Sequence, residues 1–161
     1  MLHRAVECDG IHPFRVGEAG LTADGEITLE LYEQTGADPG KGYVPARYFN
    51  IYRRRDHALA GECSLRLGHC ENTFYCGHIG YEVYEPYRGG HYAAKACKQL
   101  FEMARIEGME YLYITCAPGN IPSQKTCEYA GAVLVQMIEI PEGIEIYQTG
   151  RRVSCQYRVV L

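Results

Sequence analysis

The chain has 161 residues, a net charge of −4 and 47% hydrophobic residues. A chain of this length buries roughly 68–70% of its unfolded surface, so we predict a single domain over residues 1–161. Because the net charge is mildly negative, a broad basic surface is excluded, and we predict no nucleic-acid partner. No apolar run approaches the ~20 residues of a membrane span, and the first ten residues lack a signal-peptide core. We therefore predict a cytoplasmic protein with no membrane partner.

The cysteines are numerous but show neither zinc-finger nor C-x-x-C spacing. Most stand among apolar neighbours, as in "YITCAP" and "AAKAC", and a reduced cysteine packs like a small hydrophobe. In the reducing cytosol we expect buried free thiols, with no disulfide and no metal site. The eight residues are Cys8, Cys63, Cys70, Cys76, Cys97, Cys116, Cys127 and Cys155.

The first half of the chain alternates apolar and polar residues and is rich in aromatic and β-branched types, which predicts strands. Short polar turns join these segments, so antiparallel pairing is expected. The predicted strands are Glu26–Glu33, Ala46–Arg54, Ala58–Gly68 and Tyr75–Glu85.

The spacing of apolar residues then changes from the period of a strand to that of a helix. Charged and apolar residues fall on opposite faces over His91–Glu107, which predicts an amphipathic helix that ends at Gly108. The elements predicted after it are a strand over Met109–Ala117, a helix over Ile121–Gly131, and strands over Ala132–Pro141 and Arg151–Leu161. Because a helix separates strand 75–85 from strand 109–117, these two should run parallel. The order predicts a mixed α/β (α+β) domain with one twisted, mostly antiparallel sheet flanked by helices.

The turn "PYRGGHYAAKAC", Pro86 to Cys97, leads from a strand directly into the predicted helix. A helix N-terminus has unpaired N–H groups and readily binds phosphate. Gly89 and Gly90 let a backbone approach an anion closely, and Arg88 supplies a bidentate donor. A simple tight corner would need the same glycines, so the turn alone leaves both interpretations open.

The segments "IGYEVYEPYRGGHYAAKAC" and "YLYITCAPGNIPSQKTCEYAGAVLV" together resemble the GNAT superfamily of acyl-CoA-dependent N-acetyltransferases. The resemblance extends from about Ile79 to Val135 and is strongest to the branch that acetylates protein N-termini and related amines. In that family the R/Q-x-x-G-x-G/A loop binds the pyrophosphate of acetyl-CoA, and two parallel strands splay apart around pantetheine. The resemblance implies acetyl-CoA as co-substrate, an amine acceptor as second partner, and no metal.

The resemblance also implies which residues contact acyl-CoA. They are Val83, Tyr84, Arg88, Gly89, Gly90, His91, Tyr92, Ala93, Asn120 and Ser123. Val83 and Tyr84 would contact pantetheine through their backbone, whereas Asn120 and Ser123 would equally serve as helix caps. His91 stands where the motif has glycine, so its imidazole either crowds the phosphates or hydrogen-bonds to one.

Attack of an amine on the thioester needs a base, and the leaving thiolate needs a proton. Glu82 and His78 are base candidates because their even separation places them on one strand face. Their alternative role is a polar, half-exposed sheet face. Further base candidates are Glu62 and, on the other strand face, Tyr81. The family often has a tyrosine acid seven residues after its asparagine; Cys127 stands there, with Tyr129 two residues on. The catalytic residues predicted are Glu82, His78 and Tyr129.

Other functions remain open at this point. Because Cys127 and His91 depart from the family pattern, a non-catalytic acyl-CoA-binding module is the main alternative, and a redox or metal protein built on the cysteines comes after it. The segment 34–46 is too short for the two helices usual there in the family, so the acceptor wall must differ. The apolar closing strands suggest a possible homodimer.

Overall fold

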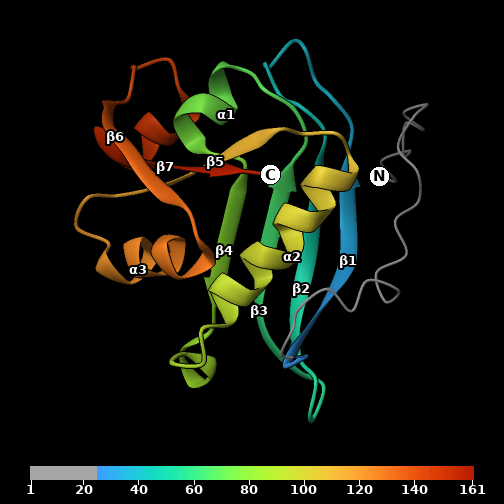
Figure 1. Cartoon of the computed structure of the whole chain (residues 1–161). Helices are drawn as coiled ribbons and strands as arrows, with labels where there is room; N and C mark the ends of the chain where they lie inside the picture. Colours follow the sequence, from blue (N-terminus) through green and yellow to red (C-terminus); the bar gives the residue numbers. More distant parts are fainter. Residues whose placement is uncertain (1–24) are drawn as a thin grey trace.

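Two separate β-sheets form the framework of the fold (Figure 1). The computed structural model describes residues 25–161, so Cys8 lies outside the described part of the chain. The first sheet has the order β1-β2-β3-β4 with antiparallel neighbours, and the second has the order β5-β7-β6. The strands are β1 (Ile27–Thr35), β2 (Ala46–Arg53), β3 (Ala58–Arg66), β4 (Ile79–Val83), β5 (Tyr111–Cys116), β6 (Val133–Glu139) and β7 (Val153–Val160).

The prediction for residues 75–85 is wrong in its first part, because Glu71–Cys76 form a short helix, α1. The Cys70 thiol accepts a hydrogen bond from the Thr73 N–H (3.4 Å), and the Thr73 hydroxyl accepts one from the Cys70 N–H (2.9 Å). This reciprocal cap begins a helix with cysteine in a position that serine or threonine usually holds. Gly77 ends α1 with a φ of 80°, so β4 starts only at Ile79.

Helix α2 (Tyr92–Ile106) covers one face of the first sheet, as Figure 1 shows. Its buried side is made largely of small residues, which let the helix approach the apolar sheet face closely. The helix side includes Ala94, Ala96, Cys97, Leu100 and Ala104, and the sheet side includes Leu29, Phe49, Ile51, Cys63 and Leu65. The predicted amphipathic helix is thus confirmed.

Buried Arg47 of β2 ties the far end of α2 to the sheet. Its Nη2 donates to a carboxylate oxygen of Glu107 over 2.7 Å, and its Nε donates to Gln34. A cation at this end also complements the partial negative charge of a helix C-terminus. The contact fixes the position of α2, and with it the position of the turn at the helix N-terminus.

His78, just before β4, joins the two sheets. Its N–H donates to the Tyr113 carbonyl (2.7 Å), and the Tyr113 N–H donates to Nδ1 of the His78 ring (2.9 Å). Because Nδ1 accepts, the ring carries its proton on Nε2, which donates to the Gly68 carbonyl (2.9 Å). These bonds replace a strand ladder, since none joins β4 to β5 within residues 25–161.

The predicted splay of the strands over 75–85 and 109–117 therefore takes the form of two sheets that meet at one end. The single twisted sheet that we expected is replaced by this pair of sheets. Helix α3 (Ile121–Ala130) packs beside α2 and β5, and the short 3-10 turns are η1 (Glu85–Tyr87) and η2 (Glu145–Thr149). The layers give a mixed α/β domain.

The buried His78 ring predicts a pH dependence of stability. Burial lowers the pKa of His78 to about 4, whereas a free imidazole has a pKa of about 6.5. The unfolded chain binds the extra proton between these values, so this contribution is complete above pH 6.5 and is lost as the pH falls toward 4. From pH 7 to pH 4.5, His78→Gln should lose less unfolding free energy than the native protein, by about 2–3 kcal/mol.

Urea unfolding at the two pH values measures this difference. His57→Asn is the control, because it removes an exposed histidine from a turn and should keep the larger loss of unfolding free energy that the native protein shows. Equal pH dependence in the native protein and in His78→Gln would show that the His78 ring is not held neutral by burial.

Candidate active site

The edge of β4 that faces away from β3 carries backbone groups for a ligand. Arg66 N–H bonds to the His78 carbonyl, and Tyr84 N–H bonds to the Ala60 carbonyl (2.8 Å), so even-numbered residues pair with β3. In an antiparallel ladder the alternate residues turn their N–H and C=O groups to the other side. Tyr81 and Val83 therefore direct theirs away from β3, along an edge that no ladder covers in the described part of the chain.

This geometry changes one predicted contact. Tyr84 has both backbone groups bonded inside the protein, since its carbonyl also accepts from the Tyr87 N–H (2.9 Å). Tyr84 therefore uses the backbone groups of the predicted contact within the fold, whereas Tyr81 directs its N–H and C=O to the open strand edge. The Val83 carbonyl accepts a hydrogen bond from Nε of Arg88 (2.9 Å), which ties the following loop to the end of β4.

The two glycines before α2 differ in the space around them. Gly89 has a φ of +93°, which favours glycine, and a Cβ added there would meet no atom within 4 Å. At Gly90, by contrast, an added Cβ would lie 3.1 Å from the Tyr92 ring. The loop thus presents bare backbone at the helix N-terminus, the arrangement that an anion requires.

His91 occupies the left-handed region at the N-cap of α2, with φ 57° and ψ 29°. Glycine adopts this conformation most readily, which explains why the family motif has glycine at this position. The His91 side chain makes no cap hydrogen bond, and its ring instead stacks on Tyr129 of α3, with centroids 4.0 Å apart and planes 6° apart. The histidine thereby joins α2 to α3 and leaves the cap of α2 without a side-chain bond.

A tyrosine hydroxyl from β4 reaches α3 and its thiols. The Tyr81 hydroxyl lies 2.7 Å from the Ser123 hydroxyl and 3.8 Å from the Cys127 sulfur. Burial raises the pKa of Tyr81 well above its usual value, so the phenol is protonated at neutral pH. Asn120 caps α3 by accepting from the Ser123 N–H (3.2 Å), which confirms its capping role.

The thiols beside Tyr81 form a connected group. Cys127 of α3 and Cys116 of β5 are neighbouring thiols, and Cys116 lies opposite Cys155 of β7. The interaction with Cys127 lowers the pKa of the Cys116 thiol, and the same interaction raises the pKa of Cys127. All cysteines of the described part are free; five are buried as predicted, whereas Cys70 and Cys76 are half-buried.

The structure separates the three residues that we predicted to be catalytic. His78 is buried, and its ring nitrogens are both engaged in the contact between the sheets. Glu82 is exposed on β4 directly opposite Glu62 of β3, and four residues of strand span roughly 13 Å between it and His78. Tyr129 is exposed on α3 against His91. The geometry thus brings together Glu62 with Glu82, and Tyr81 with Ser123.

The β1–β2 connection has no helix and closes over a cavity of about 370 Å³. Across the rim, the Tyr43 hydroxyl donates to a Glu145 carboxylate oxygen over 3.2 Å. The cavity also contacts Tyr48 and Arg66, on the sheet face opposite α2. We expected segment 34–46 to differ from the two helices usual there in the family, and the segment has no helix. No feature of the sequence predicts that η2 lies next to it.

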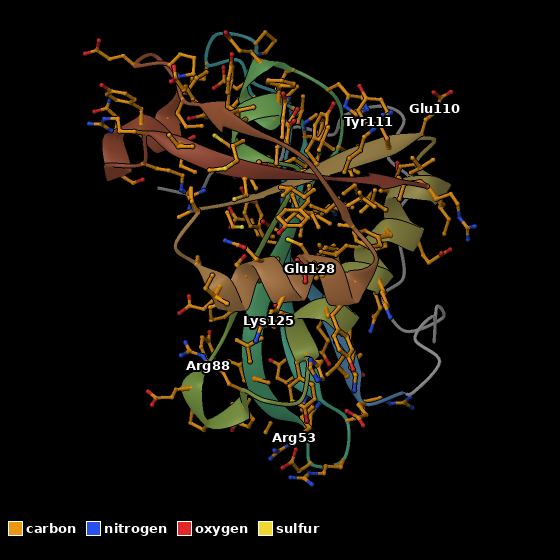
Figure 2. All side chains as sticks on the ribbon, turned by 60° about the vertical axis from the view of Figure 1, so that its left-hand side comes forward. Arg53, Arg88, Glu110, Tyr111, Lys125 and Glu128 are labelled. Atoms are coloured by element: carbon orange, nitrogen blue, oxygen red, sulfur yellow. The ribbon has the colours of Figure 1, made fainter. Side chains whose placement is uncertain are left out.

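Figure 2 shows two cations near the loop: Arg88 before α2 and Lys125 on α3, on the same side of the molecule. Within residues 25–161, no group of three or more histidine, cysteine, aspartate or glutamate side chains is arranged to hold a metal ion. The described helices include none that is long and apolar enough to cross a membrane.

Residues 20–133 match the family model described as the acetyltransferase (GNAT) domain. The chain belongs to the GNAT acetyltransferase family. No curated protein matches it in a sequence comparison. Solved structures of GNAT acetyltransferases share its fold.

One is the microcin C7 self-immunity acetyltransferase MccE in complex with acetyl-CoA and AMP, with 21% identity and a TM-score of 0.55 over 72% of this chain and 61% of that one. A GNAT-family acetyltransferase from Bacillus anthracis has 18% identity and a TM-score of 0.56 over 70% and 65%. Ribosomal-protein-S5-alanine acetyltransferase from Vibrio fischeri has 17% identity and a TM-score of 0.55 over 71% and 61%. The match spans less than two thirds of each of these chains, and at such identities the likeness is one of fold.

The strained backbone of His91 predicts an unusual order of stability among its variants. His91→Gly loses the ring stack, worth about 0.5–1.5 kcal/mol, but relieves about 1–2 kcal/mol of left-handed strain. Its unfolding free energy should stay within about 1 kcal/mol of the native value. His91→Ala loses the stack and keeps the strain, so it should be the least stable of the three proteins. Urea unfolding measures the order, and an alanine variant as stable as the glycine variant would contradict the left-handed assignment.

Proposed function

We propose that the protein is an acetyl-CoA-dependent N-acetyltransferase that acts on a primary amine by direct attack on the thioester. The observation that carries the proposal is the open edge of β4, which leads through Gly89 and Gly90 into the uncapped N-terminus of α2. A strand edge suits the amides of pantetheine, and a bare helix N-terminus suits a pyrophosphate. The two features are consecutive in the chain, as they are along acetyl-CoA.

In this proposal each end of acetyl-CoA has its own residues. The backbone of Gly89, Gly90 and His91 and the first-turn N–H groups of Tyr92 and Ala93 receive the pyrophosphate. Arg88 adds N–H donors beyond the Nε that holds the Val83 carbonyl. The N–H of Val83 and the backbone groups of Tyr81 receive pantetheine. Lys125 meets the 3′-phosphate from α3.

Tyr81 is the proposed proton donor to the leaving thiolate. When the amine attacks, the carbonyl carbon becomes tetrahedral and the nitrogen becomes positively charged. As the C–S bond then breaks, the sulfur takes the phenolic proton, and the nitrogen loses its extra proton to solvent. The phenol is suitable because it is protonated at neutral pH, and Ser123, 2.7 Å away, can relay a proton from solvent back to it. Cys127 has the position of the family's tyrosine, and the Tyr81 hydroxyl lies 3.8 Å from its sulfur, so the phenol comes from β4 instead of α3.

Glu82 is the proposed base, with Glu62 beside it. An ammonium must lose a proton before it attacks, and the two exposed carboxylates accept it directly or through a water. Neither His78 nor Tyr129 has a role in this mechanism, because one is buried between the sheets and the other stacks on His91.

The second candidate function is an acyl-CoA-binding module without turnover. Cys127 in place of the family's tyrosine and His91 in place of its glycine favour it. Isothermal titration with acetyl-CoA, followed by a thiol-release assay over a panel of small and peptide amines, separates the two. Binding with thiol release supports the transferase, binding without release supports the module, and no binding excludes both.

Gly89→Val should weaken acetyl-CoA binding at least tenfold and leave the fold intact. The new side chain points into space that is empty of protein atoms, so it meets the ligand. Gly108→Val is a matched control, because Gly108 also has a positive φ (84°) and open space around it but lies at the opposite end of α2. Isothermal titration measures both. Equal loss of affinity in the two variants would mean that backbone strain, not a phosphate site, causes the effect.

Tyr81→Phe should lower kcat by about 10²-fold or more, because a positioned general acid contributes about 10²–10⁴-fold. Acetyl-CoA affinity should change little, since the ring remains. Tyr129→Phe tests the competing candidate and should keep the native kcat. Thiol release under saturating substrates measures both values, and the reverse order would assign the acid to Tyr129.

A further inference from the structure

An acidic row crosses the face of the first sheet that lies opposite α2. Glu30 of β1 is paired with Asn50 of β2, Asn50 with Glu62 of β3, and Glu62 with Glu82 of β4. Residues directly opposite each other in neighbouring strands share a face. These four residues, the acidic row, therefore lie side by side across the whole sheet, and its three carboxylates are exposed.

Tyrosines flank the acidic row on both sides. Tyr32 and Tyr48, with ring centroids 6.3 Å apart, lie on one side, and Tyr52 and Tyr84 lie on the other. Burial, and then the charge of Glu62, raise the pKa of both Tyr32 and Tyr84, so this carboxylate acts on tyrosines from two sides. Two basic groups lie at the margins of the row: His57, 3.8 Å from Glu30, and Arg66 in the neighbouring cavity.

Among residues 25–161, this face is open rather than enclosed. In the described part of the chain, α2 is the helix that packs on this sheet, and it covers the other face (Figure 1). Tyr32 is 49% exposed. Small-molecule sites are usually concave and bury most of their ligand, whereas tyrosine-rich open surfaces are typical of contacts with polypeptides. The shape therefore favours a polypeptide as occupant.

The charges of the chain itself argue against a self-contact. Residues 1–24 include two arginines and four carboxylates, so this segment is acidic like the row. The whole chain has a net charge of −4, so a second copy is repelled as well. The two basic and four acidic residues of 1–24 are Arg4 and Arg15, and Glu7, Asp9, Glu18 and Asp24. A separate, positively charged partner remains.

We propose that the acidic row and its tyrosines bind a lysine- and arginine-rich polypeptide segment, and that the free amine of this segment is the acceptor. The inference rests on the proposed function, because it places the amine at Glu82, beside the thioester. Carboxylates pair with ammonium and guanidinium groups, and tyrosine ring faces attract the same cations. Both features of the face thus select the same partner.

The dimensions of the sheet set the expected position of the basic residues. Glu82 and Glu30 are three strand spacings apart, roughly 14 Å at about 4.8 Å each. An extended peptide rises about 3.3 Å per residue. With its amino terminus at Glu82, the peptide therefore places its residues two to about five over Glu62 and Glu30.

The test uses two fluorescent peptides of equal length with an acetylated, and hence unreactive, amino terminus. One has arginine at positions two to five, so that it contains no primary amine, and the other has glutamine there. Anisotropy at low salt should show at least tenfold tighter binding of the basic peptide, and this advantage should shrink as salt is raised. Glu30→Gln should weaken its binding about threefold or more. Glu128→Gln removes one exposed carboxylate from α3 and should leave binding unchanged.

Turnover then links the site to the reaction. With the corresponding free-amine peptides, Glu30→Gln should raise the KM for the basic peptide and leave kcat unchanged, because Glu30 is three strand spacings away from Glu82, with Asn50 and Glu62 between them. Equal binding of basic and neutral peptides, an unchanged affinity in Glu30→Gln, or tighter binding of a linear polyamine than of the basic peptide would each overturn the proposal.

Failure of the inference and failure of the proposed function give different results. Because the acetylated peptide cannot react, its binding tests the face alone. Peptide binding without any thiol release would support the acidic row as a peptide-binding site and refute the transferase function. Thiol release with small amines and no preference for the basic peptide would support the transferase function and refute the peptide-binding site.

Discussion

The His78 contact between the two sheets is the constraint on which the proposed site depends. A backbone N–H and an imidazole nitrogen bond to one residue of β5, Tyr113, and beyond this point β4 and β5 make no ladder. A continued ladder would have paired the edge groups of β4 inside the protein. With the strands held at one end only, Tyr81 keeps both of its outward backbone groups for an extended ligand, and Val83 keeps its N–H, since its carbonyl accepts from Arg88.

The same arrangement gives β4 two different sides for chemistry. Tyr81 reaches Ser123 and Cys127 of α3 on the side of α2, whereas Glu82 faces solvent next to Glu62 on the other. In the proposed mechanism the acid therefore approaches from one face of the strand and the acceptor amine from the other. The acidic row extends the proposed acceptor side across the sheet, so the proposed base and the proposed partner site share the Glu62–Glu82 pair.

The sequence predicts most of the secondary structure because its periods are clear, and the glycine turn before α2 because its residues are specialised. It does not reveal α1, since a cysteine cap is not a usual helix signal. Nor does it show that Tyr84 has both backbone groups bonded within the fold or that Tyr81 meets Ser123, 42 residues later. Such contacts depend on how separate elements pack. His78 illustrates this limit. Its even separation from Glu82 predicted that both side chains share one strand face, but His78 is buried and has a structural role.

A structure of the protein with acetyl-CoA bound would show whether β4 and the loop before α2 hold the co-substrate. We expect the pyrophosphate on the backbone of Gly89–His91, pantetheine along β4 at Tyr81 and Val83, and the thioester sulfur within hydrogen-bonding distance of the Tyr81 hydroxyl. Acetyl-CoA bound elsewhere, or with its sulfur far from Tyr81 and its acetyl group away from the Glu62–Glu82 pair, would contradict this expectation.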